Sequence, residues 1–211
     1  MVPLLPPLKD NKKIYIICEG SEEYDYLNRL KILNVWSDVY DITLRDAKGN
    51  GNLYPIYQNV YQKGNYDLVV IVCDTEKKPH EQFNDICCKV NSLHACELAS
   101  QHVVMFTNPC TMQVILLHWD TSVRLQTPSK RRSASYIEKY TGIQDYSAKE
   151  SQRTQLVSNI KKDSYRTMMN GAKQLGRDAA LINSTNLHVF FTKLEQPDTN
   201  WIDEINKLIE S

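Results

Sequence analysis

The chain has 211 residues, of which 42% are hydrophobic and 24% are charged. This balance is ordinary for a globular protein, and the length suits one core rather than two large domains. The formal net charge is zero, which argues against a protein that coats nucleic acid along its whole surface. We expect residues 1–11 to be a loose, proline-rich lead and residues 12–211 to form a single domain with a basic, helical C-terminal half from about residue 128 to residue 211.

Nothing in the sequence resembles a segment for export or membrane insertion. Residues 1–7 contain no basic residue, prolines interrupt their short apolar stretch, and no run elsewhere approaches the length of a membrane span. The six cysteines form no C-x-x-C pair, and Cys18 and Cys73 lie within apolar strand patterns. We therefore expect a cytoplasmic protein with reduced thiols and no contact with a membrane.

The first strong signal is an apolar run that stops at a carboxylate. Residues 12–18 are β-rich and predict a buried strand, and the sequence Gly-Ser-Glu then leads into a helix predicted over residues 22–33. Glu19 would lie at the tip of the strand. Ligands bind at this edge in open α/β sheets, between strand ends and helix starts. Glu19 and Glu23 are therefore candidate catalytic residues, with Gly20 and Glu22 beside them.

The next elements are a strand near residues 39–45, a turn cluster over residues 46–52 and a helix over residues 53–63. The turn lacks the Gly-Lys-Ser/Thr ending of a phosphate-binding P-loop. Because the turn follows a strand end, we expect it to border the same site, with Lys48 as a neighbour of the carboxylates.

A second apolar run repeats the first arrangement. Residues 66–73 predict a buried strand, and Asp74 and Glu76 follow it. Either pair of acids alone could simply begin a polar loop. Two such strands side by side, however, would bring Glu19, Asp74 and Glu76 together, and like charges raise one another's pKa unless a cation lies between them. These three carboxylates therefore predict a site for Mg²⁺ or Mn²⁺, which prefer oxygen ligands.

The second half of the chain is mostly helical. We predict a helix over residues 80–99, a short strand over residues 101–107, a break at Asn108-Pro109 and an apolar helix over residues 110–119. Residues 129–175 read as helical with breaks at Gly142 and Gly171. Residues 186–192 read as a last strand or a buried connection, and residues 201–210 as a closing helix. The alternation of strands and helices favours an α/β fold with a mostly parallel sheet.

The apolar helix over residues 110–119 carries His118, for which two interpretations stay open. One is a half-buried histidine that is hydrogen-bonded near the helix end, and the other is a catalytic histidine. The structural interpretation is favoured, because a histidine on an apolar helix more often serves packing than chemistry.

Positive charge is concentrated after residue 128. Residues 128–178 contain eleven Lys and Arg against five Asp and Glu, with tyrosines interleaved. This mixture suits contact with phosphates and stacking on bases, although a solvated helical surface is the plainer interpretation. The candidate nucleic-acid-binding residues are Lys130, Arg131, Arg132, Lys161, Lys162 and Arg166.

Three segments resemble successive blocks of the RloB/AbiLii-type proteins, a Toprim-fold family. They are Cys-Glu-Gly-Ser-Glu-Glu-Tyr-Asp-Tyr-Leu (18–27), Val-Cys-Asp-Thr-Glu (72–76) and Thr-Asn-Pro-Cys-Thr-Met-Gln-Val-Ile-Leu-Leu-His-Trp (107–119). The resemblance implies a Toprim-like Rossmannoid fold with a mostly parallel central sheet flanked by helices. It also implies a metal-dependent nuclease that hydrolyses RNA, tRNA included, or DNA in defence against phage. An ATPase or a restriction-system protein is the partner that it suggests.

In this resemblance the Toprim glutamate falls on Glu19, and the Asp-x-Asp motif falls on Asp74 and Glu76, which lengthens one ligand by a methylene. The family's glutamate after Asn-Pro-Cys-Phe is replaced by Met112, next to Gln113. A carboxylate that could serve a second metal ion is thus missing. The alternative function is therefore a Toprim module that binds nucleic acid or a partner protein without cutting, and Asn108, Gln113 and His118 are further candidate neighbours of the site.

Overall fold

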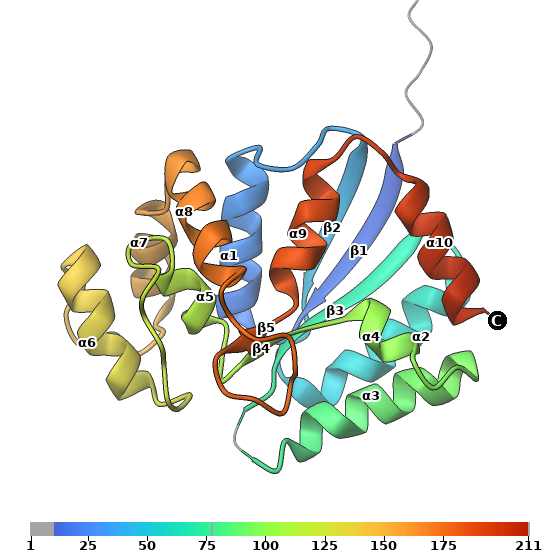
Figure 1. The fold of residues 1–211 in the computed structure, drawn as a ribbon, viewed down its shortest axis with the longest axis horizontal. Coiled ribbons are helices and arrows are strands. Elements are labelled where there is room, and N and C mark those ends of the chain that lie inside the picture. The colour runs from blue at the N-terminus through green and yellow to red at the C-terminus, as the bar shows by residue number, and fades with distance from the viewer. Residues whose placement is uncertain (1–10, 77, 211) are drawn as a thin grey trace, which may run out of the picture.

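The computed structural model describes residues 11–76 and 78–210, without the side chains of Lys130 and Arg131. Residues 1–10 of the expected N-terminal lead lie outside the described residues. A five-stranded sheet of order β2-β1-β3-β4-β5 runs through the centre (Figure 1). Its strands are β1 (Lys12–Cys18), β2 (Tyr40–Asp46), β3 (Leu68–Asp74), β4 (Val104–Asn108) and β5 (Ser184–Thr185). The first four are parallel and β5 is antiparallel to β4, so the expected α/β class with a mostly parallel sheet is confirmed.

Helices connect the parallel strands and cover both faces of the sheet. The connections contain α1 (Ser21–Ile32), the short 3-10 helix η1 (Asn50–Asn52), α2 (Leu53–Lys63), α3 (Glu81–His94) and α4 (Ala99–Val103). The order β2-β1-β3 means that the chain reverses direction across the sheet after β2, which places α1 and α2 on opposite faces. Figure 1 shows α1 and α9 (Leu187–Glu195) on one side of the sheet and α2, α3 and α4 on the other.

A group of helices extends the fold beyond α1. It consists of α5 (Met112–Leu116), α6 (Lys130–Thr141), α7 (Glu150–Ser158) and α8 (Lys162–Ala172). In Figure 1 this group lies beside α1, where α7 packs on α1 and α5 packs on α8. The chain then closes with α9 and α10 (Asn200–Ile209). Within the described ranges, no helix is long and apolar enough to cross a membrane.

The core is centred on β3, in which every residue from Leu68 to Cys73 is buried. A parallel strand covered by helices on both faces has no solvated side, which is why its sequence is a continuous apolar run. Full burial of each such side chain contributes about 1.5–3 kcal/mol to folding. This packing fixes the position of the strand end, at which Asp74 lies.

Several predicted boundaries are confirmed and others need correction. The strand over residues 12–18 and the helix over residues 53–63 have the predicted bounds. The helix predicted over residues 80–99 ends at His94, because Ala95 adopts a left-handed conformation with φ of 50°, and α4 begins only at Ala99. The apolar helix predicted over residues 110–119 is shorter and spans Met112–Leu116. The strand predicted from residue 101 begins only at Val104.

The two predicted glycine breaks have different outcomes. Gly142 ends α6 in the left-handed conformation that glycine tolerates best, so this break is confirmed. Gly171 lies within α8, so the break predicted there is wrong. A Cβ at Gly171 would stand 3.1 Å from Leu117 Cδ2 and 3.3 Å from the Thr121 Cα, which shows that this glycine permits close packing.

Residues 187–192 lie in helix α9, with Asn186 immediately before it, so the strand interpretation is wrong. The buried side chains Leu187, Phe190, Phe191 and Leu194 recur at helical spacing. The Asn186 side chain bonds to Phe106 N and Val104 O of β4, and α9 begins at the next residue. A short run of aromatic residues does not distinguish a buried helix from a strand.

Candidate functional site

Glu19 follows β1 at the carboxyl end of the sheet. Its backbone N–H donates to Val72 O at 3.0 Å, which continues the pairing of β1 with β3. Its side-chain Oε2 accepts the backbone N–H of Asp74 at 3.0 Å, and its Oε1 accepts from Asn50 Nδ2 at 3.2 Å. Because the connections leave β1 and β3 in opposite directions, Glu19 lies at the topological switch point, where open α/β sheets bind ligands.

Asp74 is the last residue of β3 and lies beside Glu19. Its Oδ1 accepts the backbone N–H of Thr111 at 2.7 Å and the Thr111 hydroxyl at 2.8 Å. The segment after β4 is thereby tied to the end of β3. Glu76 follows two residues later in a left-handed conformation with φ of 55°, and its side chain is exposed.

The first turn of α1 supplies two more carboxylates. Glu23 is buried, and its Oε2 accepts the backbone N–H of Gly20 at 3.0 Å, which satisfies one of the free donors at the helix start. Glu22 Oε1 accepts the hydroxyl of Tyr146 at 2.8 Å. Acids at this position interact favourably with the positive end of the helix dipole.

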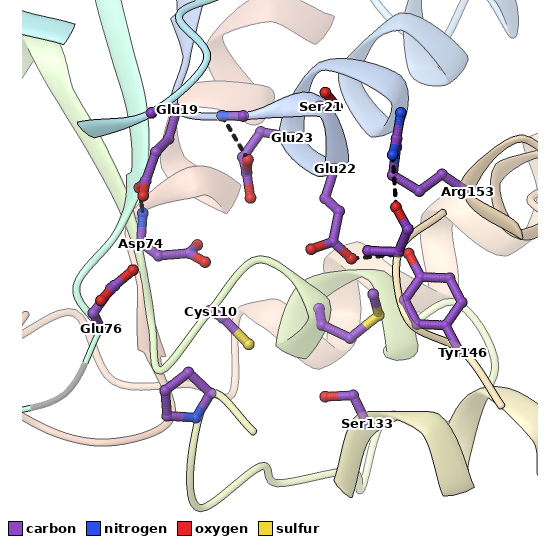
Figure 2. Close-up of a pocket in the computed structure, with 15 residues that line it drawn as sticks. Glu19, Ser21, Glu22, Glu23, Asp74, Glu76, Cys110, Ser133, Tyr146 and Arg153 are labelled. Atoms are coloured by element: carbon purple, nitrogen blue, oxygen red, sulfur yellow. Dashed lines mark hydrogen bonds between the residues drawn. The ribbon is translucent and has the colours of Figure 1, made fainter. Parts of the chain in front are cut away.

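These carboxylates open onto one cavity of about 370 Å³. Figure 2 shows Glu19, Asp74 and Glu76 along one side of it and Tyr146 and Arg153 on the opposite side. Arg153 donates from Nε to Asp25 Oδ2 at 2.7 Å. The remaining lining residues are Gly20, Ser21, Glu22, Glu23, Gly49, Cys110, Met112, Pro128, Ser133 and Ala148.

Burial and mutual repulsion raise the pKa values of Glu19, Glu23 and Asp74. Burial raises the pKa of Glu19 to about 7, with the charges of Glu23 and Glu76 adding to it, although the Asp74 N–H opposes the shift. The pKa of Asp74 is raised well above its ordinary value by burial and then by the charges of Glu23 and Glu19. Burial also raises the pKa of Glu23. Glu19 is therefore partly protonated near pH 7, and a bound cation would displace that proton.

The donor set fits a hard divalent cation. Within the described parts of the chain, no three His, Cys, Asp or Glu side chains are grouped as ligands around one point. Mg²⁺, however, commonly takes only one or two protein carboxylates, with water and substrate phosphates in the other positions. Glu19 and Asp74 can supply such a pair, because both line the cavity and the charge of Glu19 acts on Asp74.

Four predicted neighbours of the site do not line the cavity, namely Lys48, Asn108, Gln113 and His118. The Lys48 side chain is exposed, and its backbone N–H donates to Asp46 Oδ1 at 2.7 Å. Asn108 Nδ2 donates to Ala179 O at 2.8 Å. The buried Gln113 amide bonds Val123 O and Leu125 N, so it holds the segment after α5 in place. Gly20 and Glu22, in contrast, do line the cavity.

His118 does not line the cavity either, and it belongs to a buried network. The Ser164 hydroxyl donates to Lys161 O at 2.8 Å, so it can accept from His118 Nδ1 at 2.9 Å. His118 Nε2 is then free to accept from the Tyr26 hydroxyl at 3.1 Å. Burial lowers the pKa of His118 to about 3, so the ring is neutral at physiological pH. This network supports the structural interpretation of His118.

The basic residues fall into two groups. Pro128 and Ser133 line the cavity, so the run Lys130-Arg131-Arg132 at the start of α6 lies at its edge. Arg132 is exposed, whereas the side chains of the other two lie outside the described structure. Lys162 Nζ donates to Asn34 O at 3.0 Å, past the C-terminal end of α1. Since α1 spans about 18 Å, Lys161, Lys162 and Arg166 are not brought to the carboxylates.

The lining residues that the sequence patterns did not propose for the site include Cys110, Ser133, Tyr146 and Arg153. Tyr146 and Arg153 occur in the basic, tyrosine-rich stretch, and that composition was the one signal that could have found them. Met112 also lines the cavity, at the position where the family resemblance expects a glutamate.

Comparisons of this chain with protein-family models, with curated proteins and with solved structures give no match.

Proposed function

We propose that this protein is a Toprim-like phosphodiesterase that uses Mg²⁺ or Mn²⁺ to hydrolyse RNA, tRNA included, or DNA. The observation that supports it best is the pairing of Glu19 with Asp74 at neighbouring strand tips, facing a cavity lined by further carboxylates. The resemblance to the RloB/AbiLii-type proteins supports the same reaction. It also leads us to propose that the reaction takes place in the cytoplasm, in defence against phage, alongside an ATPase or a restriction-system partner.

The residues of the cavity have separate roles in this proposal. Glu19 and Asp74 hold the cation, and Glu23 or Glu22 orients the attacking water. A bound Mg²⁺ or Mn²⁺ supplies charge for the scissile phosphate and acidifies a water molecule. Arg153, across the cavity from Glu19 and Asp74, offers a guanidinium to the phosphate while Asp25 fixes its orientation.

The substrate path runs along the start of α6 in this proposal. Carboxylates repel a phosphodiester, so cations near the metal site must hold the substrate backbone. Lys130, Arg131 and Arg132 begin α6 between Pro128 and Ser133, both of which line the cavity. Tyr146 lies on the same side of the cavity as Arg153 (Figure 2).

The test is a cleavage assay on single-stranded DNA, double-stranded DNA and tRNA with each metal. Glu19→Gln and Asp74→Asn remove charge without changing side-chain size, and we expect each to lower the rate by at least about a hundredfold. Asp85→Asn, which alters an exposed ion pair with Lys89, is the matched control and should keep full activity. Undiminished cleavage by both site variants would overturn the proposed function.

A second function, binding without cleavage, is favoured by Met112. This side chain lines the cavity where a carboxylate would serve a second ion. A binding module of this kind would retain nucleic acid or a partner protein without any metal. Calorimetry separates the two functions, because the nuclease must bind Mn²⁺ through Asp74, whereas the binding module should bind nucleic acid equally well in a chelator.

A further inference from the structure

A second cavity, of about 250 Å³, adjoins the carboxylate cavity. It lies between η1, the segment after β3 and the start of α3, and its lining residues include Asn50, Thr75 and His80. Asp74 and Glu76 line both cavities. The Asp74 and Glu76 carboxylates thus border both cavities.

Polar atoms without hydrogen-bond partners are concentrated around this second cavity. Among the described residues, seven buried side-chain nitrogen and oxygen atoms lack a partner, and three of them are Asn50 Oδ1, Thr75 Oγ1 and His80 Nε2. All three residues line this cavity. Burying a polar atom without a partner is unfavourable, so three around one cavity indicate a ligand that satisfies them.

The local hydrogen bonds show that Asn50 Oδ1 and His80 Nε2 present lone pairs, and the oxygen of the Thr75 hydroxyl carries lone pairs by its chemistry. Asn50 Nδ2 donates to Glu19 Oε1 at 3.2 Å and to Gln82 Oε1 at 2.8 Å, so both amide hydrogens are used and Oδ1 is the remaining acceptor. His80 Nδ1 lies 2.8 Å from Thr75 O, and a carbonyl oxygen can only accept. Nδ1 therefore carries a proton, and in the neutral tautomer that this bond selects the lone pair is on Nε2.

An imidazole that donates one N–H to a backbone carbonyl and leaves the other nitrogen bare is the usual arrangement of a metal-binding histidine. His80 is 9% exposed, which leaves little access for bulk water. The neighbouring groups are the amide oxygen of Asn50, the hydroxyl of Thr75 and the carboxylates of Asp74 and Glu76. These donors attract a cation; Lys78 also lines the cavity, but its side chain is exposed.

We propose that Asn50, Thr75 and His80, together with a carboxylate of Asp74 or Glu76, form a second divalent-cation site. An imidazole among oxygen ligands suits Mn²⁺ better than Mg²⁺. This inference rests on the proposed function, in which Glu19 and Asp74 hold the first ion. The second ion would be held mainly by residues between β3 and α3. It would therefore not require a carboxylate at position 112, where this chain has Met112.

The experiment is Mn²⁺ titration of the whole chain, followed by electron spin echo spectroscopy, which detects nitrogen bound to Mn²⁺. We expect wild type to bind two Mn²⁺ per chain and to show a nitrogen signal. Labelling histidine with ¹⁵N should change that signal, and this control needs no substitution. His80→Ala should bind one Mn²⁺ and lose the signal, whereas His102→Ala, a change in a partly exposed histidine of α4, should keep both.

Thr75→Val is the second variant, because it keeps the side-chain shape while removing the hydroxyl. It should weaken the second Mn²⁺ by about tenfold and leave the first unchanged. Mn²⁺ bound by wild type without a histidine nitrogen signal would overturn this inference and leave the first site standing. Conversely, a histidine signal in a protein that cleaves no nucleic acid would support the second site and count against the nuclease. Two Mn²⁺ retained in His80→Ala would also overturn the inference.

Discussion

The carboxylate of Glu19 accepts the backbone N–H of Asp74 at 3.0 Å, so the side chain that follows β1 is held against the residue that ends β3. The bond involves the main chain of Asp74 and therefore does not depend on the Asp74 side chain. A glutamine at position 19 can accept the same hydrogen bond through its amide oxygen. Amide substitutions at these two positions thus change charge while preserving the arrangement of the strand tips.

The first prediction concerns the pH dependence of stability without metal. An acid whose folded pKa is raised binds more protons when folded, so stability falls as pH rises through the window between the two pKa values. For Glu19 that window runs from its ordinary pKa of 4.5 to about 7. We expect the free energy of unfolding to fall by about 1–3 kcal/mol across it, in urea titrations at pH 5 and pH 8 with chelator present.

Glu19→Gln is the matched variant for this prediction. It removes the titrating group but keeps an acceptor for the Asp74 N–H. The variant should be more stable than wild type at pH 8 without metal, and its stability should change less between pH 5 and pH 8. Equal pH dependence in both proteins would show that Glu19 is not desolvated in solution.

A carboxylate introduced at Met112 should strengthen metal binding. Met112 lines the cavity and is buried, so Met112→Glu adds a further acid to Glu19, Glu23, Asp74 and Glu76. Without metal we expect about 1–3 kcal/mol of destabilisation, because another charge is desolvated among like charges. With Mn²⁺ the affinity should increase by about tenfold or more. Met112→Leu controls for volume, and equal Mn²⁺ affinity in both variants would contradict the prediction.

The two basic groups should differ in their effect on nucleic-acid binding. Changing Lys130, Arg131 and Arg132 to glutamine should weaken binding to duplex DNA and flatten its salt dependence by about 0.9 in log-log slope for each phosphate that the variant no longer neutralises. The same change at Lys161, Lys162 and Arg166, at the far end of α1, should leave the slope unaltered. A salt titration of both triple variants measures this difference. A flatter slope only in the Lys161, Lys162 and Arg166 variant would indicate that the substrate binds along α8 instead.

Gly171→Ala tests the packing of α8. Its Cβ would lie 3.1 Å from Leu117 Cδ2 and 3.3 Å from Thr121 Cα, and backbone cannot move aside easily. We expect the unfolding free energy to fall by about 1–3 kcal/mol. Gly51→Ala is the control, since no atom lies within 4 Å of the Cβ built there. Similar thermal melts for both variants would argue against the close approach.

The sequence predicted the sheet more accurately than the helices that surround it. Buried parallel strands such as β1 and β3 are continuous apolar runs, so their ends and the acids after them could be identified directly. The tips of adjacent parallel strands meet at one edge, which is why Glu19 and Asp74 were correctly placed together. The prediction of three carboxylates at one edge is likewise consistent with the lining of the cavity.

The opposite wall of the cavity could not be predicted in the same way. Tyr146 and Arg153 reach it only because α7 packs on α1, and no local pattern encodes that packing. His80 was missed because its role depends on the hydrogen bond to Thr75 O and on the space beyond it. These residues reach their sites through tertiary packing. Neither residue periodicity nor spacing along the chain predicts such packing.

Calorimetric titration of Mn²⁺ into wild type and into the double variant Glu19→Gln, Asp74→Asn, at pH 8, tests most directly whether these two carboxylates hold a cation. The double variant keeps the Asp74 N–H donor and an acceptor at position 19, so the strand tips should stay in place. We expect measurable binding in wild type and at least about a hundredfold weaker affinity at the Glu19 site in the variant. Equal Mn²⁺ affinity and stoichiometry in the two proteins, or no binding to wild type, would contradict the proposed cation site.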